Sequence, residues 1–402
     1  MTSIQVHVDS PAGTVPVGTA RITRRRGIET TEFTYDDDFL SGPGWEVSPD
    51  LPIHTRGLVV QGLPGALDDC APDSWGRNLI TRRLASQARD AGHSTPAPTE
   101  VDFLLGVNDV TRPGALKFRL DDDQPFLAES AEVPRLIKLE ALVTAAKQVS
   151  EDGDASDAVA TLLAAGSGSL GGARPKVSVT DGTTLHIAKF PHHRDRWDVM
   201  RWEAVALDLA AKCGLRTPAH QLLEVGGDPV LLVTRFDRDG DARIPYLSGR
   251  SLIGATDGRT SDYLELVHGL MDHGSNVNAD LAELWRRIAF SIAINNTDDH
   301  MRNHAVLRSS GGWALSPLFD VNPDPRLAAG RASSVGGATR AEDCHHALLA
   351  RAAHFGLGPA AAQQAWRAVV QVVSGWRRTA SHHGISEAAQ AVFAPAMDRW
   401  SP

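Results

Sequence analysis

Alternating apolar and polar positions predict β-strands in the first third of the chain and again in its middle. The first three runs, IQVHV, VPVGTARIT and TEFTYD, follow the two-residue period of a half-buried strand and are separated by Gly and Pro. The Asp-Gly pair at residues 181 and 182 predicts a hairpin turn between two of the middle strands. Strands are expected over residues 4–8, 15–23, 31–36, 114–126, 176–179, 185–190 and 229–238, and a short strand pair over residues 304–317.

Apolar residues at helical spacing predict helices between and after these strands. Asp73 or Ser74 is expected to cap the first helix, which runs through Trp75, and Gly214 is expected to end another. The acidic tract of small residues at 151–158 predicts a loop or hinge. Helices are expected from residue 74 to about residue 84, and over residues 134–149, 201–214, 283–294 and 359–378.

Together these elements predict an α+β fold in three consecutive segments. Residues 1–125 are expected to form a β-rich N-terminal subdomain, residues 126–246 a small β lobe, and residues 247–402 a large helical C-terminal lobe. A chain of 402 residues is too long for one simple core, which agrees with several compact parts.

Composition narrows the classes of function. A net charge of −9 argues against a protein that binds nucleic acid mainly by charge. The basic stretch RITRRRG (residues 21–27) is either a local contact for DNA or a partner, or a solvated strand edge. Cys70, Cys213 and Cys344 lie far apart without a CxxC pair, which predicts neither a disulfide framework nor a zinc site. Since the sequence shows no signal-peptide pattern and no apolar run of membrane length, we expect a cytoplasmic protein.

The strongest candidate for chemistry is NNTDDHMRNH (residues 295–304), which follows an apolar helix. Asp298 and Asn303 are five positions apart, which is the arrangement that protein kinases use in their catalytic loop. Asp320 comes directly after a short apolar strand in LSPLFDVNP. Because Mg²⁺ prefers oxygen ligands, we expect Asn303 and Asp320 to hold Mg²⁺ beside the nucleotide phosphates. Asp298 is then expected to orient the acceptor hydroxyl.

Upstream of this loop, AAGSGSLGGARPK (residues 164–176) carries four glycines and matches neither the Walker loop nor GxGxxG. It is either a cradle for phosphate groups or a flexible linker. Lys189 shares a strand face with Leu185 and Ile187, so it needs an anion unless it lies on an edge strand and reaches solvent. Glu203 on the next helix is expected to form an ion pair with this lysine. These features occur in the order of a protein kinase, which predicts a two-lobed kinase-like fold.

The motifs resemble the HipA-type toxin kinases of bacterial toxin–antitoxin modules over nearly the whole chain. The resemblance is carried by APDSWGR (71–77), TRPGALKFRL (111–120), SLGGARPK (169–176), HIAKFP (186–191), VTRFDR (233–238), NTDDHMRN (296–303) and PLFDV (317–321). It implies a serine/threonine protein kinase that uses ATP and Mg²⁺, with Asp298 as the catalytic residue and Asn303 and Asp320 at the metal. The nucleotide-binding residues that it implies are Gly171, Gly172, Ala173, Arg174, Pro175, Lys176, Lys189, Thr234, Arg235, Phe236, His300, Met301, Arg302, Asn303, Phe319 and Asp320.

The resemblance also implies a regulatory serine and a set of partners. Ser169 lies at the autophosphorylation serine of the family, and Ser167 completes an SxS pair. A phosphate there adds nearly two negative charges to a loop shaped for ATP phosphates, so we expect it to expel the loop and lower activity. The implied partners are a HipB-like helix-turn-helix antitoxin, operator DNA through that antitoxin, and a protein substrate of the aminoacyl-tRNA synthetase class.

Two other functions are compatible with the same motifs. One is a catalytically idle corepressor bound to its antitoxin, and the other is a small-molecule or lipid kinase on the same catalytic plan. The intact set of Lys189, Asp298, Asn303 and Asp320 favours an active kinase over the idle corepressor.

Overall fold

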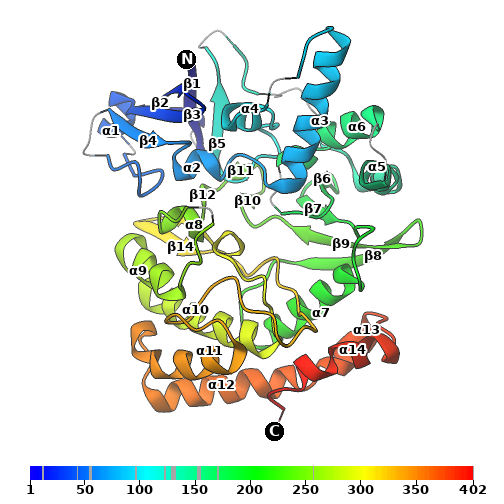
Figure 1. The fold of residues 1–402 in the computed structure, drawn as a ribbon. Helices are drawn as coiled ribbons and strands as arrows, with labels where there is room; N and C mark the ends of the chain where they lie inside the picture. Colours follow the sequence, from blue (N-terminus) through cyan, green and yellow to red (C-terminus); the bar gives the residue numbers. More distant parts are fainter. Residues whose placement is uncertain are drawn as a thin grey trace. The chain divides into compact units, whose positions relative to one another are not determined.

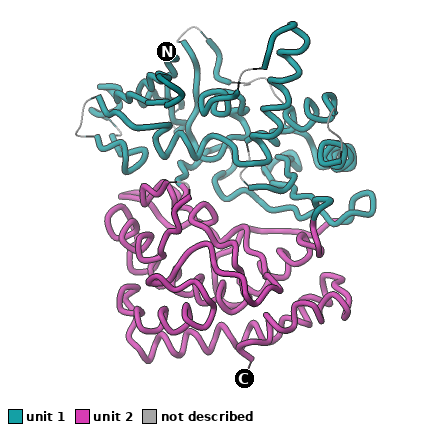
Figure 2. Tube along the Cα trace, in the orientation of Figure 1, with its two compact units in different colours: residues 1–194, 224–247 teal, residues 195–223, 248–402 magenta. Residues whose placement is uncertain are grey.

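The computed structural model divides the chain into two compact units (Figure 2). Unit 1 comprises residues 1–194 and 224–247, and unit 2 comprises residues 195–223 and 248–402. The chain therefore crosses from one unit to the other three times, and the units do not coincide with three consecutive segments. The residues that the structure describes are 1–10, 13–42, 44–53, 57–95, 97–121, 124–127, 133–151, 155–169, 172–256 and 258–401.

The first part of unit 1 is a five-stranded sheet of order β4-β3-β2-β1-β5 (Figure 1). Its strands are β1 (Thr2–Ser10), β2 (Gly13–Arg25), β3 (Ile28–Tyr35), β4 (Leu58–Gln61) and β5 (Leu116–Arg119). The antiparallel register places Ile4 opposite Ala20 and Ala20 opposite Phe33, and all three side chains are fully buried. The first three predicted strands are therefore confirmed. The predicted strand 114–126 is too long, because β5 ends at Arg119 before an acidic turn.

Helices accompany this sheet and the segment that follows it. They are α1 (Asp37–Ser41), α2 (Gly65–Asp68), α3 (Ser74–Asp90), α4 (Glu100–Leu105), α5 (Leu139–Glu151) and α6 (Ser156–Ala164), with short 3₁₀ turns η1 (Leu136–Lys138) and η2 (Ser167–Ser169). The loop predicted over residues 151–158 is wrong at its end, because α6 begins at Ser156 and buries Val159 and Leu162. Residues 152–154 lie outside the described part of the chain.

A second sheet of order β6-β7-β9-β8 completes unit 1. Its strands are β6 (Lys176–Thr180), β7 (Leu185–Lys189), β8 (His220–Val225) and β9 (Asp228–Thr234), and a small hairpin follows from β10 (Arg238–Asp239) and β11 (Ala242–Arg243). Strands β6 and β7 pair antiparallel with Thr180 opposite Leu185, which confirms the hairpin predicted at the Asp-Gly pair. The predicted strand 229–238 is divided, because β9 ends at Thr234.

Unit 2 is mostly helical. Its helices are α7 (Val199–Lys212), α8 (Gly249–Leu252), α9 (Tyr263–His273), α10 (Val277–Ala293), α11 (Ala341–Ala350), α12 (Pro359–Val373), α13 (Trp376–His382) and α14 (Glu387–Met397), with 3₁₀ turns η3 (Met301–Asn303) and η4 (Ala352–Phe355). The single helix predicted over residues 359–378 is wrong, since Ser374 and Gly375 separate α12 from α13. Gly375 is a poor helix former, and after it Trp376 packs on Trp202 of α7 at 5.8 Å between ring centroids.

The segment that carries the catalytic motif follows α10. The loop that is predicted to be catalytic (residues 294–304, called the catalytic loop below) leads into a hairpin of β13 (Ala305–Ser309) and β14 (Gly312–Leu315). Strand β12 (Tyr246–Ser248) contains the last crossing of the chain between the units. Twelve of the seventeen residues of α10 are buried, so the loop starts from a fixed point in the core. Among the described residues, no helix is long and apolar enough to cross a membrane.

Candidate active site

The catalytic loop of unit 2 is organised around a buried carboxylate, that of Asp299. This residue is 4% exposed and accepts hydrogen bonds from the hydroxyl groups of Tyr263 and Ser291, the latter at 2.6 Å. The Nε2 atom of His304 lies 2.9 Å, and the guanidinium of Arg331 3.3 Å, from the same carboxylate. Side chains from four parts of unit 2 therefore hold one residue of the loop.

These contacts fix the charge of the Asp299 side chain. Burial alone would raise the pKa of Asp299, but His304 and Arg331 outweigh burial and hold that pKa well below its usual range. Burial, together with Asp299, raises the pKa of Tyr263 well above its ordinary value. The carboxylate thus stays charged and the phenol neutral at ordinary pH, and the network is structural. The sequence analysis did not select Asp299, because nothing in the Asp298-Asp299 pair indicates which of the two carboxylates is buried.

The neighbouring Asp298 has the opposite environment. It lies on the surface, whereas Asn303 is 6% exposed. The side-chain amide of Asn303 donates to the backbone carbonyl of Asp298 at 3.0 Å and approaches that of Asp320 at 3.5 Å. Unit 2 therefore brings together the three residues that the sequence selected for catalysis and metal binding.

A second set of bonds attaches the loop to the segment around Asp320. The amide nitrogen of Asn295 lies 2.6 Å from the carbonyl of Asp324, and the hydroxyl of Thr297 lies 2.7 Å from its carboxylate. The backbone N–H of Asp324 donates in return to the carbonyl of Asn295 at 3.1 Å. The two chain segments consequently form one structural element.

Asp320 has a backbone angle φ of 54°, in the left-handed region that residues other than Gly seldom occupy. Such conformations are often found at functional sites, where the surrounding structure maintains them. The residues fit Mg²⁺ by their chemistry, because the Asn303 nitrogen is used by the two carbonyls, which leaves its side-chain oxygen, and Asp320 supplies a carboxylate. Among the described residues no group of three or more His, Cys, Asp or Glu could hold a metal ion. The two residues Asn303 and Asp320 would suffice for Mg²⁺, because this ion usually keeps several water and phosphate ligands of its own.

The glycine-rich loop of unit 1 is anchored by residues that precede it in the sequence by about a hundred positions. The N–H of Gly172 donates to the carboxylate of Asp73 at 2.8 Å, and its carbonyl accepts from the N–H of Trp75 at 3.2 Å. Asp73 is the N-cap residue of α3, as predicted, but its side chain makes no capping bond. Its carboxylate binds the glycine-rich loop instead. Gly172 has φ of 94°, which favours glycine.

Two buried lysines lie side by side next to this loop. Lys176 of β6 is directly opposite Lys189 of β7, and they are 5% and 9% exposed. Residues directly opposite in an antiparallel pair project from the same face, where two like charges repel unless an anion compensates them. A side chain at Gly172 would meet the Lys176 ammonium at 2.3 Å, so this ammonium lies against the loop. The edge-strand alternative for Lys189 is wrong, since β7 lies between β6 and β9.

The two serines of the SxS pair are buried. The hydroxyl of Ser167 donates to the carbonyl of Lys176 and accepts from the indole N–H of Trp75 at 2.8 Å. The hydroxyl of Ser169 lies 2.6 Å from the carbonyl of Gly166 and 2.7 Å from the hydroxyl of Thr111. The loop must therefore open before either hydroxyl can be modified.

Arg235, which was predicted to bind nucleotide, has its guanidinium in a buried network instead. It binds both oxygens of Asp237 and donates to the carbonyls of Thr111 and Arg112. Arg238 also donates to the Arg112 carbonyl, at 2.8 Å. Burial raises the pKa of Asp237, but the two arginines outweigh it and hold that pKa well below its usual range. The backbone N–H of Arg235 is also used within unit 1, since it donates to the carbonyl of Leu185 at 3.0 Å, and nucleotide binding by this residue stays a prediction.

The other predicted residues occupy different positions. Gly171 lies outside the described part of the chain, and Glu203 is 2% exposed on α7 in unit 2, whereas Lys189 belongs to unit 1. The ion pair between them stays a prediction. The hydroxyl of Thr234 lies 3.2 Å from the Nδ1 atom of His186. In the remaining set Pro175 and Met301 are buried, Ala173 is exposed, and Arg174, Phe236, His300, Arg302 and Phe319 are intermediate.

The α+β architecture and the Asp-Asn-Asp arrangement are accompanied by two matches to family models. The model of the HipA-like C-terminal domain matches residues 168–376, which is more than half of the chain. The model of the HipA N-terminal domain matches residues 12–105. The chain belongs to the HipA family, as its motifs predicted.

Individual relatives agree with this assignment. The chain is 24% identical over 144 residues to a Haemophilus influenzae protein named "Putative kinase", covering 31% of this chain and 42% of that protein. It is 28% identical over 178 residues to "Putative kinase Y4mE" of Sinorhizobium fredii, covering 38% of this chain and 41% of that protein. The chain thus spans about two fifths of the length of these curated relatives.

The fold is that of a solved structure from Shewanella oneidensis, the HipA of a toxin–antitoxin complex of HipA, HipB and operator DNA. The two are 13% identical, with a TM-score of 0.65 over 99% of this chain and 95% of that one. This match confirms the α+β, kinase-like fold class.

Replacing Asp299 by Asn is expected to destabilise the protein by about 3–5 kcal/mol, because it leaves the buried Arg331 without its counter-charge. Replacing the exposed Asp298 by Asn is the matched control and should change the free energy of unfolding by less than about 0.5 kcal/mol. Urea unfolding at neutral pH measures both variants. Equal stability of the two would contradict the structural role of Asp299.

The interaction of Asp299 with His304 and Arg331 also predicts how the stability of the protein depends on pH. The pKa of Asp299 is lower in the folded state than its unfolded value of about 3.9, so its stabilisation is complete above that value and is lost as pH falls through the folded pKa. The stability difference between the natural protein and Asp299→Asn should therefore be constant above about pH 5 and shrink below about pH 4. Unfolding curves at several pH values test this, and a difference that grows on acidification would refute it.

Proposed function

We propose that this protein is an ATP- and Mg²⁺-dependent serine/threonine protein kinase that acts as the toxin of a toxin–antitoxin module. The membership of the HipA family supports the toxin class, and the naming of two relatives as kinases supports phosphoryl transfer. The single observation that carries the proposal is the arrangement in unit 2, in which the Asn303 amide joins the backbones of Asp298 and Asp320.

Each unit has a distinct role in this proposal. In unit 1, Lys176, Lys189 and the N–H groups of the glycine-rich loop bind phosphate oxygens. In unit 2, Asn303 and Asp320 would hold Mg²⁺, which neutralises charge on the transferred phosphoryl group. The exposed carboxylate of Asp298 accepts a hydrogen bond from the acceptor hydroxyl, orients it for in-line attack and receives its proton.

The partners follow from the family. The Shewanella relative was solved with HipB and operator DNA, which supports a HipB-like helix-turn-helix antitoxin and, through it, operator DNA for this protein. The substrate proposed is a protein, with the aminoacyl-tRNA synthetases as the class to examine first. Such a substrate and such partners are found in the cytoplasm, which is the location we propose.

Self-modification at Ser169, or at Ser167, is part of the same proposal. Both hydroxyls are buried and hydrogen-bonded within unit 1, so a phosphate on either is incompatible with the present loop. Adding nearly two negative charges beside Gly172 and the two lysines would also occupy the place proposed for nucleotide phosphates. Autophosphorylation is therefore expected to inhibit the kinase.

Replacing Asp298 by Asn is expected to lower phosphoryl transfer from ATP to protein by at least about a hundredfold, since the acceptor hydroxyl loses its base. The assay supplies ATP, Mg²⁺ and a cell lysate, with purified lipids and sugars in parallel. Asp272→Asn, an exposed carboxylate of α9, is the matched control and should retain full activity.

Three results would contradict the proposal. Transfer to a lipid or sugar but to no protein would indicate a small-molecule kinase. No transfer by the natural protein, with intact binding of a helix-turn-helix antitoxin, would indicate an idle corepressor. Full activity of Asp298→Asn would remove the assigned base.

Incubation of the natural protein with ATP and Mg²⁺ is expected to add a phosphoryl group to Ser169 or Ser167, detected by mass spectrometry of peptides. The double variant Ser167→Ala and Ser169→Ala should gain none there. In addition, the phosphorylated protein should bind ATP at least about tenfold more weakly than the double variant, because of like-charge repulsion. Equal affinity would exclude the inhibitory role.

A further inference from the structure

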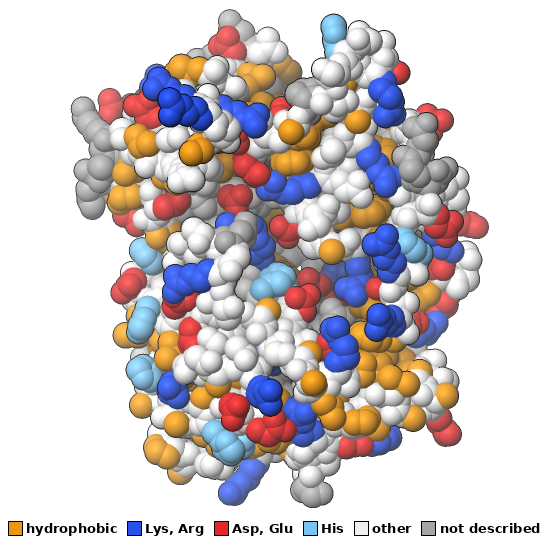
Figure 3. All heavy atoms as spheres, in the orientation of Figure 1, with side chains coloured by type: hydrophobic (Ala, Val, Ile, Leu, Met, Phe, Trp, Pro, Cys, Tyr) orange, Lys and Arg blue, Asp and Glu red, His pale blue; other side chains and the backbone are white. Residues whose placement is uncertain are grey.

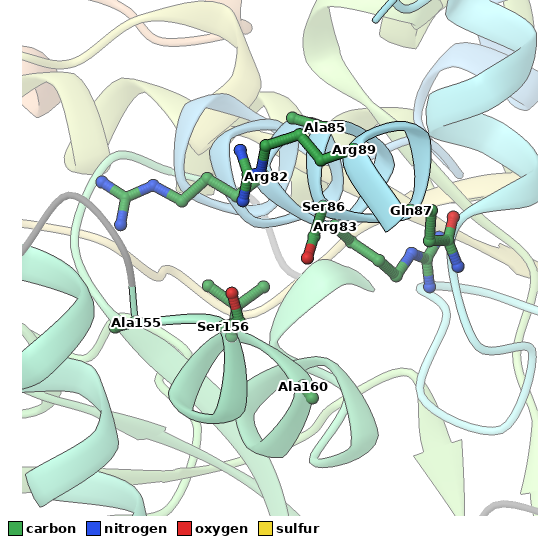
Figure 4. A pocket seen from close by; sticks show the side chains of 10 residues that line it. Arg82, Arg83, Ala85, Ser86, Gln87, Arg89, Ala155, Ser156 and Ala160 are labelled. Atoms are coloured by element: carbon green, nitrogen blue, oxygen red, sulfur yellow. The ribbon is translucent and has the colours of Figure 1, made fainter. Parts of the chain in front are cut away.

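A pocket of about 200 Å³ lies within unit 1, between α3 and α6 (Figure 4). Side chains of α3 line one side of the pocket, and Ala155, Ser156 and Ala160 line the other. No residue assigned to catalysis or nucleotide binding borders it. The pocket therefore needs an explanation of its own.

The lining is strongly basic. Arg82, Arg83 and Arg89 all border the pocket, and among its described lining residues there is no carboxylate. On the molecular face shown in Figure 3, by contrast, acidic and basic side chains are interspersed. Asp157 lies in the first turn of α6 but does not line the pocket. Three positive charges around one concavity favour an anion.

Two of these arginines show specific features. Arg82 is held in place by bonds of 3.0 Å to the side chain of Asn78 and to the carbonyl of Val149. The Nε atom of Arg83 is buried and has no hydrogen-bond partner among the described residues. Burial lowers the pKa of Arg83, and no carboxylate of the described chain offsets this effect. A buried donor without a partner is costly, and a bound anion would satisfy it.

The opposite wall adds further donors. Helix α6 begins at Ser156, and its N-cap residue, Ala155, has no side chain that can accept from the first N–H groups. These N–H groups and the positive end of the helix favour a negatively charged ligand. The hydroxyls of Ser86 and Ser156 line the same space.

We propose that the α3–α6 pocket is a binding site for a phosphate monoester. A guanidinium matches two phosphate oxygens at once, which explains arginines rather than lysines around the site. One water occupies about 30 Å³ of liquid, so the pocket has room for a phosphate group and a few atoms of its ester. Ala85, Val159 and Ala160 supply apolar contacts for those atoms.

A nucleic-acid backbone fits these observations less well. A polymer of phosphodiesters needs an extended basic surface, whereas this site is a small, half-open concavity on a chain of net charge −9. The proposal does not depend on kinase activity. The monoester has two possible sources, a free metabolite or a phosphorylated side chain, and both present the same dianion.

Isothermal titration calorimetry of the full chain distinguishes these sources. The ligands are inorganic phosphate, glycerol 3-phosphate, and a peptide of residues 164–176 with or without phosphate on Ser169. Tighter binding of glycerol 3-phosphate supports a metabolite, and tighter binding of the phosphopeptide supports a phosphorylated side chain. Only the titration with the phosphopeptide rests on the proposed function, because it presumes that the kinase phosphorylates Ser169. A short DNA duplex is the fourth ligand.

Arg83→Gln is expected to weaken binding of the preferred monoester at least about tenfold, because it removes a charged donor that is proposed to form a hydrogen bond with the phosphate. Ala160→Glu should do the same without altering an arginine, because it adds a carboxylate to the lining. Arg367→Gln, an exposed arginine of α12, is the matched control. Lys189→Gln separates this pocket from the phosphate site of the proposed kinase, because binding that persists in Lys189→Gln and is lost in Arg83→Gln belongs to the pocket. The proposal is overturned by any of three results: no monoester binding, binding that neither pocket variant alters, or a response to the duplex alone.

Discussion

The catalytic loop depends on the burial of Asp299. A carboxylate without contact to water must be matched by donors and positive charge, and here the hydroxyls, the imidazole and the guanidinium come from Tyr263, Ser291, His304 and Arg331. Because Tyr263 and Arg331 lie 36 and 32 residues from Asp299 in the sequence, their convergence on it fixes the loop relative to the core of unit 2. The adjacent residue, Asp298, is then directed outward, since consecutive side chains cannot occupy the same pocket. The buried carboxylate of Asp299 thus lies directly beside the exposed carboxylate that we propose as the base.

A comparable network organises unit 1. The carbonyls of residues 111–116 accept hydrogen bonds from Arg235, Arg238 and Arg243, and the N–H of Gly114 donates to Asp237. The four side chains of Arg235, Asp237, Arg238 and Arg243, which follow the second sheet in the sequence, thereby bind the segment that leads into β5 of the first sheet. The hydroxyl of Thr111, in the same loop, contacts Ser169. The two sheets of unit 1 and its glycine-rich loop are therefore joined by one continuous set of hydrogen bonds.

The sequence predicted the elements with the clearest periodicity and the motif with the densest chemistry. Strands β1 to β3, the β6–β7 hairpin and α10 were found because their patterns are local. The convergence of Asp298, Asn303 and Asp320 within unit 2 also agrees with the order of the motifs. The position of Asp73 at the start of α3 was predicted, but the bond of its carboxylate to the glycine-rich loop was not, because a residue at a helix start has the same local signal whether its side chain caps the helix or binds a distant loop. Asp299 and Arg331 were missed for a similar reason: burial and long-range pairing leave no trace in spacing. The pairing of Lys189 with Glu203 stays a prediction, since its residues belong to different units.

The left-handed backbone at Asp320 restricts what can replace this residue. Gly and Asn adopt that conformation readily, whereas β-branched or bulky residues do so only with strain. Only Asp combines the conformation with a full negative charge. Substitution of Asp320 by Asn or Gly should therefore preserve the shape of the loop and remove only the carboxylate, so that the fold is kept while a single letter of the sequence changes.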